Sequence, residues 1–181
     1  MQKLINLNKP LITIGITSFN SIRTINRAVN SALEQYWRPI EVIIVDDFST
    51  DNGYEILEKM ADNFPEIRVF RNSKNEGVAF SRNKIISKAK GEFIAFFDDD
   101  DESLPNRLDQ QFLRIVEYEK DFAKNKLVIC HCARNIHYGN NKVIYENTVG
   151  ENTGNEAPSG IQVARRIPCR ETLLKNCYGS I

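Results

Sequence analysis

The sequence predicts an α/β protein with a mainly parallel β-sheet flanked by helices and an antiparallel hairpin in the C-terminal part. Over the first hundred residues, short apolar runs alternate with longer stretches in which apolar residues recur at helical spacing. This alternation is typical of repeated β-α units. After about Lys126 the pattern changes to short extended segments around a turn. A chain of 181 residues is long enough to bury a sizeable core.

The apolar runs are the candidate strands, because each is short, apolar and bounded by polar or turn-forming residues. Polar or acidic residues directly follow three of them. The runs are Leu11–Ile16, Val42–Val45, Ile67–Phe70 and Phe93–Phe97.

The segments between and after these runs predict four helices. The first extends from about Ser21 to Gln35, where apolar residues recur at helical spacing. The second is expected to be capped by Ser49 or Thr50 and stopped by Pro65. The third follows Gly77 through Lys88 and is closed by Gly91, and Pro105 is expected to open the fourth.

The C-terminal part predicts a hairpin followed by a mobile loop. Leu127–Cys132 and Lys142–Tyr145 flank the turn-forming residues 139–141. Residues 150–160 are rich in Gly, Asn, Glu and Pro, which favours a loop. We expect one subdomain over residues 1–125 and the start of a second over 126–181, with the chain ending inside that second subdomain.

The composition excludes several classes of function. The 24 basic and 24 acidic residues give a formal net charge of zero, so bulk charge favours neither nucleic acid nor an anionic membrane as a partner. No run approaches the roughly 18 apolar residues needed to cross a bilayer, and the N-terminus lacks the apolar core of a secretion signal. We therefore expect a cytoplasmic protein with no transmembrane segment in this chain, with a position at the inner face of the membrane left open.

The cysteines do not predict a metal or redox site, because no C-x-x-C pair is present. In the extended segment Cys130-His131-Cys132, the two cysteines point to one face and His131 to the other, which favours an ordinary strand over a metal site. The four cysteines are Cys130, Cys132, Cys169 and Cys177.

Polar and acidic residues follow three of the predicted strands: Thr17–Asn20, Asp46-Asp47 and Asp98–Asp101. The carboxyl ends of parallel strands meet at one edge of a sheet, where ligands gather. Four adjacent carboxylates repel one another and favour a divalent cation. Carboxylate oxygens suit Mg²⁺ or Mn²⁺, whose remaining positions are filled by water and phosphate oxygens.

Each acidic segment also has a simpler interpretation. Asp98–Asp101 can be a solvated surface turn, and Asp46-Asp47 with Ser49 and Thr50 can be a helix cap with a spare charge. A calcium loop is not favoured, because the spacing lacks the glycine and terminal glutamate of an EF-hand. The position of both clusters at strand ends is what favours a functional site.

Together these segments resemble the family 2 glycosyltransferases, whose catalytic domains have the GT-A fold. The resemblance covers roughly residues 10–120 and implies that residues 1–125 form a nucleotide-sugar-binding subdomain and residues 126–181 the start of an acceptor-side subdomain. The matching segments, in order, are Leu11–Asn20, Glu41–Asp51, Arg71–Gly77 with Ser81–Asn83, and Lys90–Asp101 continuing to Leu108.

The resemblance implies roles for particular residues. Asp98 and Asp100 match the outer members of a metal-binding D-x-D motif, with Asp99 between them at the nucleotide. Asp47 matches an acid that accepts a hydrogen bond from the nucleotide base. The remaining matches are Thr17 and Phe19, which line the base and ribose pocket, and Arg82, which faces the phosphates; Asn20 and Asn83 are expected to hold loop geometry.

The implied function is metal-assisted transfer, with inversion, of a sugar from a nucleotide-diphosphate donor, expected to be a UDP-sugar, to a carbohydrate or lipid-linked acceptor in surface polysaccharide biosynthesis. The sequence departs from the family in two places. Glu102 and Ser103 follow the acids where the family has an apolar or aromatic residue, which leaves open which acids hold the ion. No Glu-Asp-type motif for the general base appears before Ile181.

Two alternatives therefore stay open. One is a catalytically incomplete domain that binds a nucleotide sugar without transferring it. The other is a receiver-like phosphotransfer module, because Val45-Asp46-Asp47 also resembles an acidic pair that holds Mg²⁺. That module would need a lysine at the end of a fifth parallel strand.

Overall fold

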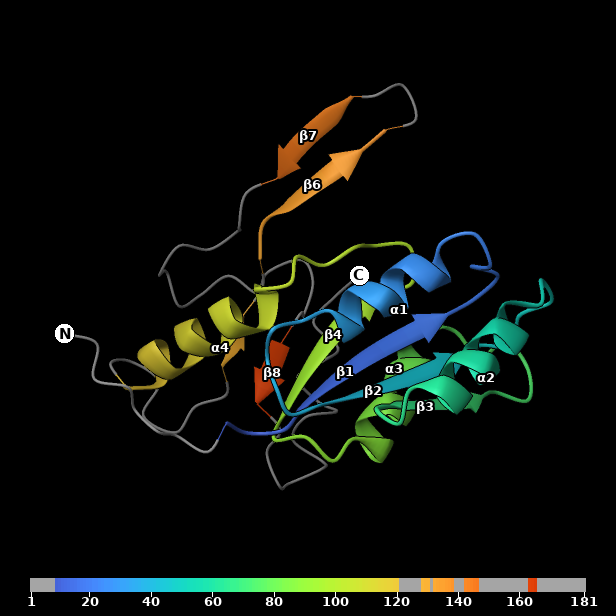
Figure 1. The fold of residues 1–181 in the computed structure, drawn as a ribbon, viewed down its shortest axis with the longest axis horizontal. Helices are drawn as coiled ribbons and strands as arrows, with labels where there is room; N and C mark the ends of the chain where they lie inside the picture. Colours follow the sequence, from blue (N-terminus) through green and yellow to red (C-terminus); the bar gives the residue numbers. More distant parts are fainter. Residues whose placement is uncertain (1–8, 121–127, 131, 139–141, 147–162, 166–181) are drawn as a thin grey trace.

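A computed structural model describes residues 9–120, 128–130, 132–138, 142–146 and 163–165. Its main sheet contains four parallel strands in the order β3-β2-β1-β4, extended by two short strands beyond β4 (Figure 1). The α/β class, the parallel sheet and the four predicted strands are confirmed, each strand within two residues at either end. The parallel strands are β1 (Ile12–Ser18), β2 (Ile40–Asp46), β3 (Ile67–Arg71) and β4 (Phe93–Asp98).

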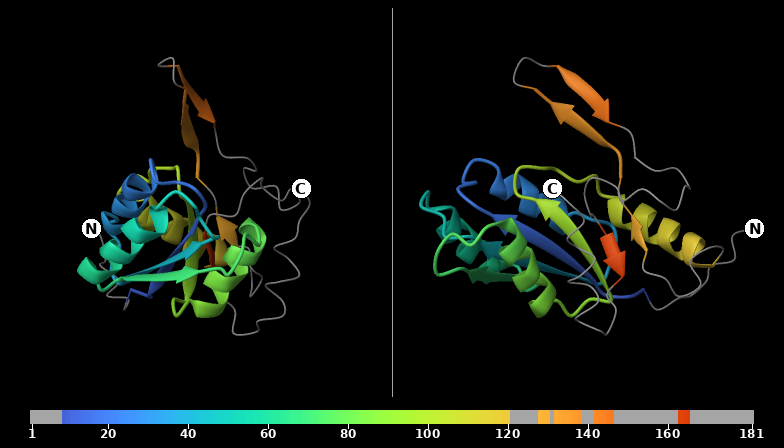
Figure 2. Two further views of the ribbon diagram at one scale, coloured as in Figure 1. Left: turned by 90° about the vertical axis from the view of Figure 1, so that its right-hand side faces the viewer. Right: turned by 180° about the vertical axis from the view of Figure 1, so that it is seen from behind.

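The helices cover both faces of this sheet. The larger core lies under α1 (Ile25–Leu33), α2 (Gly53–Asn63) and α4 (Arg107–Tyr118), and the smaller core lies under α3 (Val78–Lys88) on the opposite face (Figure 2). All seven residues of β2 are buried. This is expected of a parallel strand covered by helices on both sides.

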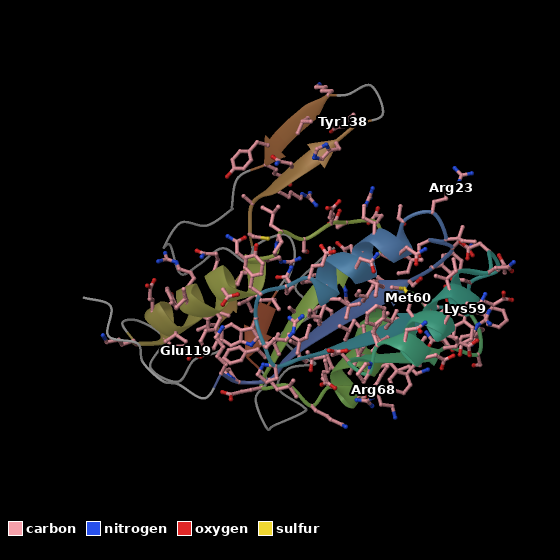
Figure 3. The ribbon with its side chains drawn as sticks, viewed as in Figure 1. Arg23, Lys59, Met60, Arg68, Glu119 and Tyr138 are labelled. Carbon is pink, nitrogen blue, oxygen red and sulfur yellow. The ribbon has the colours of Figure 1, made fainter. Side chains whose placement is uncertain are left out.

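The exposed and buried faces of α2 follow its sequence pattern. Leu57 is fully buried and Met60 packs against the larger core, whereas Lys59 is exposed (Figure 3). These positions lie on different faces of a helix because successive residues are rotated by about 100°. The apolar stripe of α2 therefore packs on the larger core next to β3, the strand at one edge of the sheet.

Three predicted helix starts were wrong by a few residues. Helix α1 begins at Ile25 after a turn at 21–24, and α4 begins two residues after Pro105. Neither Ser49 nor Thr50 caps α2, which begins at Gly53. Instead, Ser49 Oγ accepts a hydrogen bond from Asn20 N, and Thr50 N donates to Asn20 Oδ1, so both residues join two loops.

The hairpin exists, but its first strand was misplaced. It pairs β6 (Arg134–His137) with β7 (Val143–Glu146) and projects from the body on the side of the β1 and β4 carboxyl ends (Figures 1 and 2). Within the predicted strand Leu127–Cys132, β5 (Ile129–Cys130) instead pairs with β8 (Val163–Arg165) in the main sheet. Buried Val128 and a bond from Gln111 Nε2 to Cys130 O (3.3 Å) hold it there.

Several expectations fall outside the described residues. These are the turn at 139–141, the loop at 150–160, His131 and the chain end. Within the described part of the chain, no helix is long and apolar enough to cross a membrane. The sheet continues past β4 with the antiparallel strand β8, so these residues do not contain the fifth parallel strand that a receiver-like module would need.

Candidate functional site

A cavity of about 260 Å³ lies at the carboxyl ends of the central strands. The chain fills the sheet outward from β1 to β3 and then returns to the other side of β1 with β4, which makes this edge a topological switch point. The register places Ser18 beside Asp46 and Thr17 beside Asp98. The cavity is lined by Thr17, Ser18, Phe19, Asp47, Val78, Ser81, Asp98, Asp99 and Asp100.

The structure thus brings together residues that are far apart in the sequence. The cavity includes every predicted site residue except Arg82, whose Nη2 lies 3.2 Å from Oδ1 of Asp98. The acids after β2 and β4 therefore face one cleft, as the parallel topology led us to expect. Their individual roles stay predictions.

Asp47 is held rigidly at the wall of this cavity and is only 4% exposed. Its Oδ1 accepts hydrogen bonds from the side-chain amide of Asn72 (2.7 Å) and from Glu76 N (2.9 Å), and its Oδ2 accepts one from Gly77 N (2.7 Å). Burial alone would raise the pKa of Asp47. The bonds from Glu76, Asn72 and Gly77 outweigh burial and hold this pKa below its ordinary value of 3.8.

Asp46 has a different environment although it is the next residue. It is fully buried, its Oδ2 lies 3.1 Å from Nε of Arg71, and it accepts a bond from Ser49 N (3.1 Å). Side chains alternate between the two faces of a strand, so adjacent carboxylates point in opposite directions. Only Asp47 of this pair lines the cavity.

The segment after β1 presents an aromatic ring at the cavity. Phe19 is 47% exposed although it is large and apolar. Its backbone N–H donates to Oδ2 of Asp99 (3.1 Å), and Asn20 follows in the left-handed region with a φ of 52°. The amide oxygen of Asn20 holds Thr50 N at 2.8 Å, which confirms that Asn20 maintains loop geometry.

The acid run Asp98–Asp101, at the end of β4, brings several carboxylates close together. Burial raises the pKa of Asp101, and the carboxylates of Asp98 and Asp100 raise it further. Burial also raises the pKa of Asp99, against the lowering effect of the bond from Phe19 N. Burial is the larger cause of both raised pKa values, and a cation would offset the smaller contribution from repulsion between these carboxylates.

These residues fit a divalent cation that is coordinated both by carboxylates of the acid run and by a phosphate. Within the described ranges, no group of three or more His, Cys, Asp or Glu side chains is placed to hold a metal alone. Mg²⁺ and Mn²⁺ are commonly bound through one or two carboxylates together with substrate phosphates and water. One oxygen of Asp99 is engaged by Phe19 N and one oxygen of Asp98 by Arg82, so these contacts do not by themselves select the carboxylates that would hold the ion.

A half-buried arginine, Arg107, contacts the chain on both sides of the acid run. Arg107 donates to Phe96 O (3.0 Å) and to Ser103 Oγ (2.6 Å), and its guanidinium lies 4.1 Å from the ring centroid of Phe97. It therefore ties the end of β4 to the segment that follows the acids. Arg27 adds a second tie, from its Nη2 to the backbone oxygen of Asp100 (2.9 Å).

Sequence reasoning missed several residues of the site. Ser18 and Ser81 line the cavity, but each stands directly beside a residue that was predicted, Thr17 and Arg82 respectively. Asn72 is 4% exposed and touches Asp47. The available signal was a polar residue two positions after a predicted strand, which is also where Asp47 lies.

Comparison with known proteins agrees with this geometry. Residues 13–157 match the family model described as glycosyl transferase family 2. The chain is 38% identical over 112 residues to UDP-Glc:alpha-D-GlcNAc-diphosphoundecaprenol beta-1,3-glucosyltransferase WfaP of Escherichia coli, covering 62% of this chain and 43% of that protein. It is 36% identical over 109 residues to the putative teichuronic acid biosynthesis glycosyltransferase TuaG of Bacillus subtilis, covering 60% and 43%.

A solved structure, S. aureus TarS 1–349 in complex with UDP-GlcNAc, matches with a TM-score of 0.54 and 30% identity. The match covers 60% of this chain and 32% of that one. The chain spans less than half the length of the curated relatives it matches.

Proposed function

This chain belongs to glycosyl transferase family 2 and has the GT-A fold, and from this premise we propose that its cavity binds the nucleotide-diphosphate sugar from which a glycosyl group is transferred. The observation that carries the proposal is that one cavity joins Asp47, after β2, with Asp98, Asp99 and Asp100 at the end of β4. A nucleoside diphosphate has a base with ring N–H groups at one end and a charged diphosphate at the other. The base suits the Asp47 side of the cavity, and the diphosphate with its cation suits the acid run.

We place the nucleobase at the Asp47 side. This carboxylate is an acceptor at the cavity wall, oriented by bonds from Asn72, Glu76 N and Gly77 N and by the hydroxyl of Ser81. A ring N–H is a suitable partner for it, and Thr17 and exposed Phe19 then line the base and ribose. The names of TarS 1–349 in complex with UDP-GlcNAc and of the UDP-Glc-dependent WfaP favour UDP as the nucleotide.

We place the diphosphate at the acid run. A divalent cation, Mn²⁺ or Mg²⁺, held by Asp98 and Asp100 would offset the charge on the departing nucleoside diphosphate. Arg82 lies beside Asp98, and its guanidinium fork suits phosphate oxygens. Asp99 holds the Phe19 backbone at the nucleotide and thereby connects the two ends of the ligand.

The reaction follows as a single in-line displacement. An acceptor hydroxyl oxygen forms a bond to the anomeric carbon while its proton passes to a general base and the bond from that carbon to the diphosphate oxygen breaks, which inverts the anomeric configuration. The acceptor is a carbohydrate or lipid-linked sugar in surface polysaccharide synthesis, consistent with the names of WfaP and TuaG. A lipid-linked acceptor would bring the protein to the inner face of the membrane.

Calorimetry with UDP-GlcNAc and UDP-Glc in the presence of Mn²⁺ tests the proposal. We expect metal-dependent binding that Asp100→Ala lowers at least tenfold, because a contact with a charged group is worth about 1.5–3 kcal/mol. The matched control is Asp62→Ala, which removes an exposed carboxylate of α2. Unchanged affinity in Asp100→Ala would refute the assignment of the acid run.

A nucleotide sugar held in this cavity can either be used for transfer or only be bound. An incubation with UDP-sugar and a diphosphate-linked GlcNAc acceptor separates the two functions. Release of UDP together with a glycosylated acceptor supports transfer. Tight donor binding without either product would support the binding function.

A further inference from the structure

We propose that Asn72 is a positioning residue for nucleotide recognition: its side-chain amide fixes the carboxylate of Asp47, and Lys84 fixes the amide. The proposal rests on the proposed function, in which Asp47 accepts a hydrogen bond from the nucleobase. It assigns a role to a buried network behind the cavity, formed by residues of β2, of α3 and of the loop after β3.

Both hydrogens of the Asn72 amide have partners. Its Nδ2 donates to Oδ1 of Asp47 (2.7 Å) and to Oγ of Ser81 (2.9 Å). Its own backbone N–H donates to Asp46 O (2.9 Å), which ties the residue to the end of β2. Asn72 is thus held at three points, two on its side chain and one on its backbone, and is only 4% exposed.

Lys84 sets the orientation of this amide. Its Nζ donates to Oδ1 of Asn72 (3.0 Å) and to Arg71 O (2.8 Å). A flipped amide would point its oxygen at the Asp47 carboxylate and its NH₂ group at the Lys84 ammonium, and both contacts would be repulsive. The charges on either side therefore select one orientation.

The orientation of the Asn72 amide fixes the direction in which the Asp47 carboxylate can accept a hydrogen bond from a ligand. With Asn72 and Glu76 N on Oδ1 and Gly77 N on Oδ2, the carboxylate cannot rotate without breaking hydrogen bonds. The carboxylate, which lines the cavity, therefore keeps one orientation. Without Asn72, Oδ1 loses one of its two donors, and the carboxylate loses a constraint on the orientation that it presents to the base.

Replacement of Asn72 by aspartate gives the sharpest test, because it converts the contact into a pair of acids 2.7 Å apart. When both are ionised they repel, and Lys84 offsets only part of that repulsion. When the new side chain is protonated, its O–H can donate to Asp47 as the amide does. Other charges near the pair are already engaged: Asp46 with Arg71, and Glu76 with Lys74.

The experiment measures the dissociation constant of UDP with Mn²⁺ at pH 5.5, 7.0 and 8.5, for wild type and Asn72→Asp. The ratio of the two constants cancels the titration of the nucleotide itself. We expect a ratio of about ten or more at pH 8.5, as for a lost hydrogen bond to a charged group, that falls toward one at pH 5.5. A ratio near one throughout would overturn the proposal.

Three controls separate positioning from general damage. Asn63→Asp makes the same change on the exposed surface of α2 and should leave the ratio at one. Binding of inorganic pyrophosphate with Mn²⁺ should be the same in Asn72→Asp and wild type, and an equal loss for pyrophosphate and UDP would contradict a role at the base. Lys84→Met keeps Asn72 itself and should weaken UDP binding by a smaller factor, and unchanged binding would count against the role of Lys84.

Failure of the proposed function has a different signature. Wild-type protein that binds none of UDP, GDP and dTDP would refute nucleotide binding, and with it the role of Asn72. Wild-type protein that binds UDP while Asn72→Asp binds it equally at every pH would refute only the role of Asn72.

Discussion

Asp46 and Asp47 are adjacent in the sequence but lie in different environments, one in the protein interior and one at the cavity wall. Asp46 is buried against Arg71, and its Oδ1 lacks a hydrogen-bond partner in the part of the chain described. Asp47 lies in a cradle of backbone and amide donors at the cavity. The sequence predicted an acidic pair at this strand end. Strand alternation separates the two carboxylates, but which one meets α3 depends on packing that the sequence pattern does not show.

The Asp46–Arg71 pair predicts a stability effect at the residue scale. Arg71→Met should destabilise the fold by about 2–3 kcal/mol, since it leaves a buried carboxylate without its counter-charge. This is below the range for a fully buried pair because Arg71 retains contact with water. Urea denaturation measures the effect, and Asp46→Asn in the same protein should recover part of it.

A matched control for this prediction is Arg114→Met on α4. Arg114 and Glu117 form an exposed pair 4.0 Å apart, and such pairs contribute about 0–1 kcal/mol. Equal losses in Arg71→Met and Arg114→Met would show that the buried charge is not the cause.

Asp47 predicts a pH dependence of stability. Its pKa is lowered in the folded state from 3.8, so its ionised form stabilises the fold above about pH 4, and this contribution is lost as pH falls through the folded pKa. The stability advantage of wild type over Asp47→Asn should therefore be constant from pH 7 to 5 and shrink below about pH 4. Denaturation curves over this range would contradict the account if the advantage grew on acidification.

At the scale of elements, periodicity located the strands and helices well because the sheet is buried on both faces. Boundaries were missed where polar side chains found partners elsewhere in the fold. Ser49 and Thr50 have the composition of helix caps, yet both are engaged by Asn20, some 30 residues away. Local propensity cannot anticipate such competition.

The connection between α3 and β4 passes very close to the backbone of β1 at Gly91. Glu41 Oε1 accepts from Thr13 Oγ1 (2.6 Å) and Gly91 N (3.2 Å), and Arg68 lies beside this connection (Figure 3). A Cβ on Gly91 would lie 2.5 Å from Thr13 N and 2.9 Å from Leu11 O. These are backbone atoms of β1 and its approach, so they cannot move aside cheaply.

Gly91→Ala should therefore destabilise the protein by about 2 kcal/mol, within the range for overpacking. Thermal unfolding measures the loss, with Ser73→Ala in an exposed loop as the control. A change in Gly91→Ala no larger than in the control would mean that β1 and β4 tolerate more separation than the structure indicates.

At the scale of the whole molecule, the strand order creates the site. Placing β4 beside β1, on the side opposite β2, brings the three polar strand ends to one cavity. Parallel topology made this convergence predictable from the sequence. The pairing of β5 with β8 was not predictable, because those segments are more than 30 residues apart and their pattern does not specify a partner.

The central claim is that acids from two strand ends share one nucleoside diphosphate. Amide NMR during titration of UDP with Mg²⁺ tests it most directly. The signals of Phe19 and Asp99 report the ends of β1 and β4, and the signal of Gly77 reports Asp47, after β2, to which its N–H donates. The account predicts that all three signals shift together with a single dissociation constant. Shifts confined to one strand end, or different constants for Gly77 and Asp99, would contradict it.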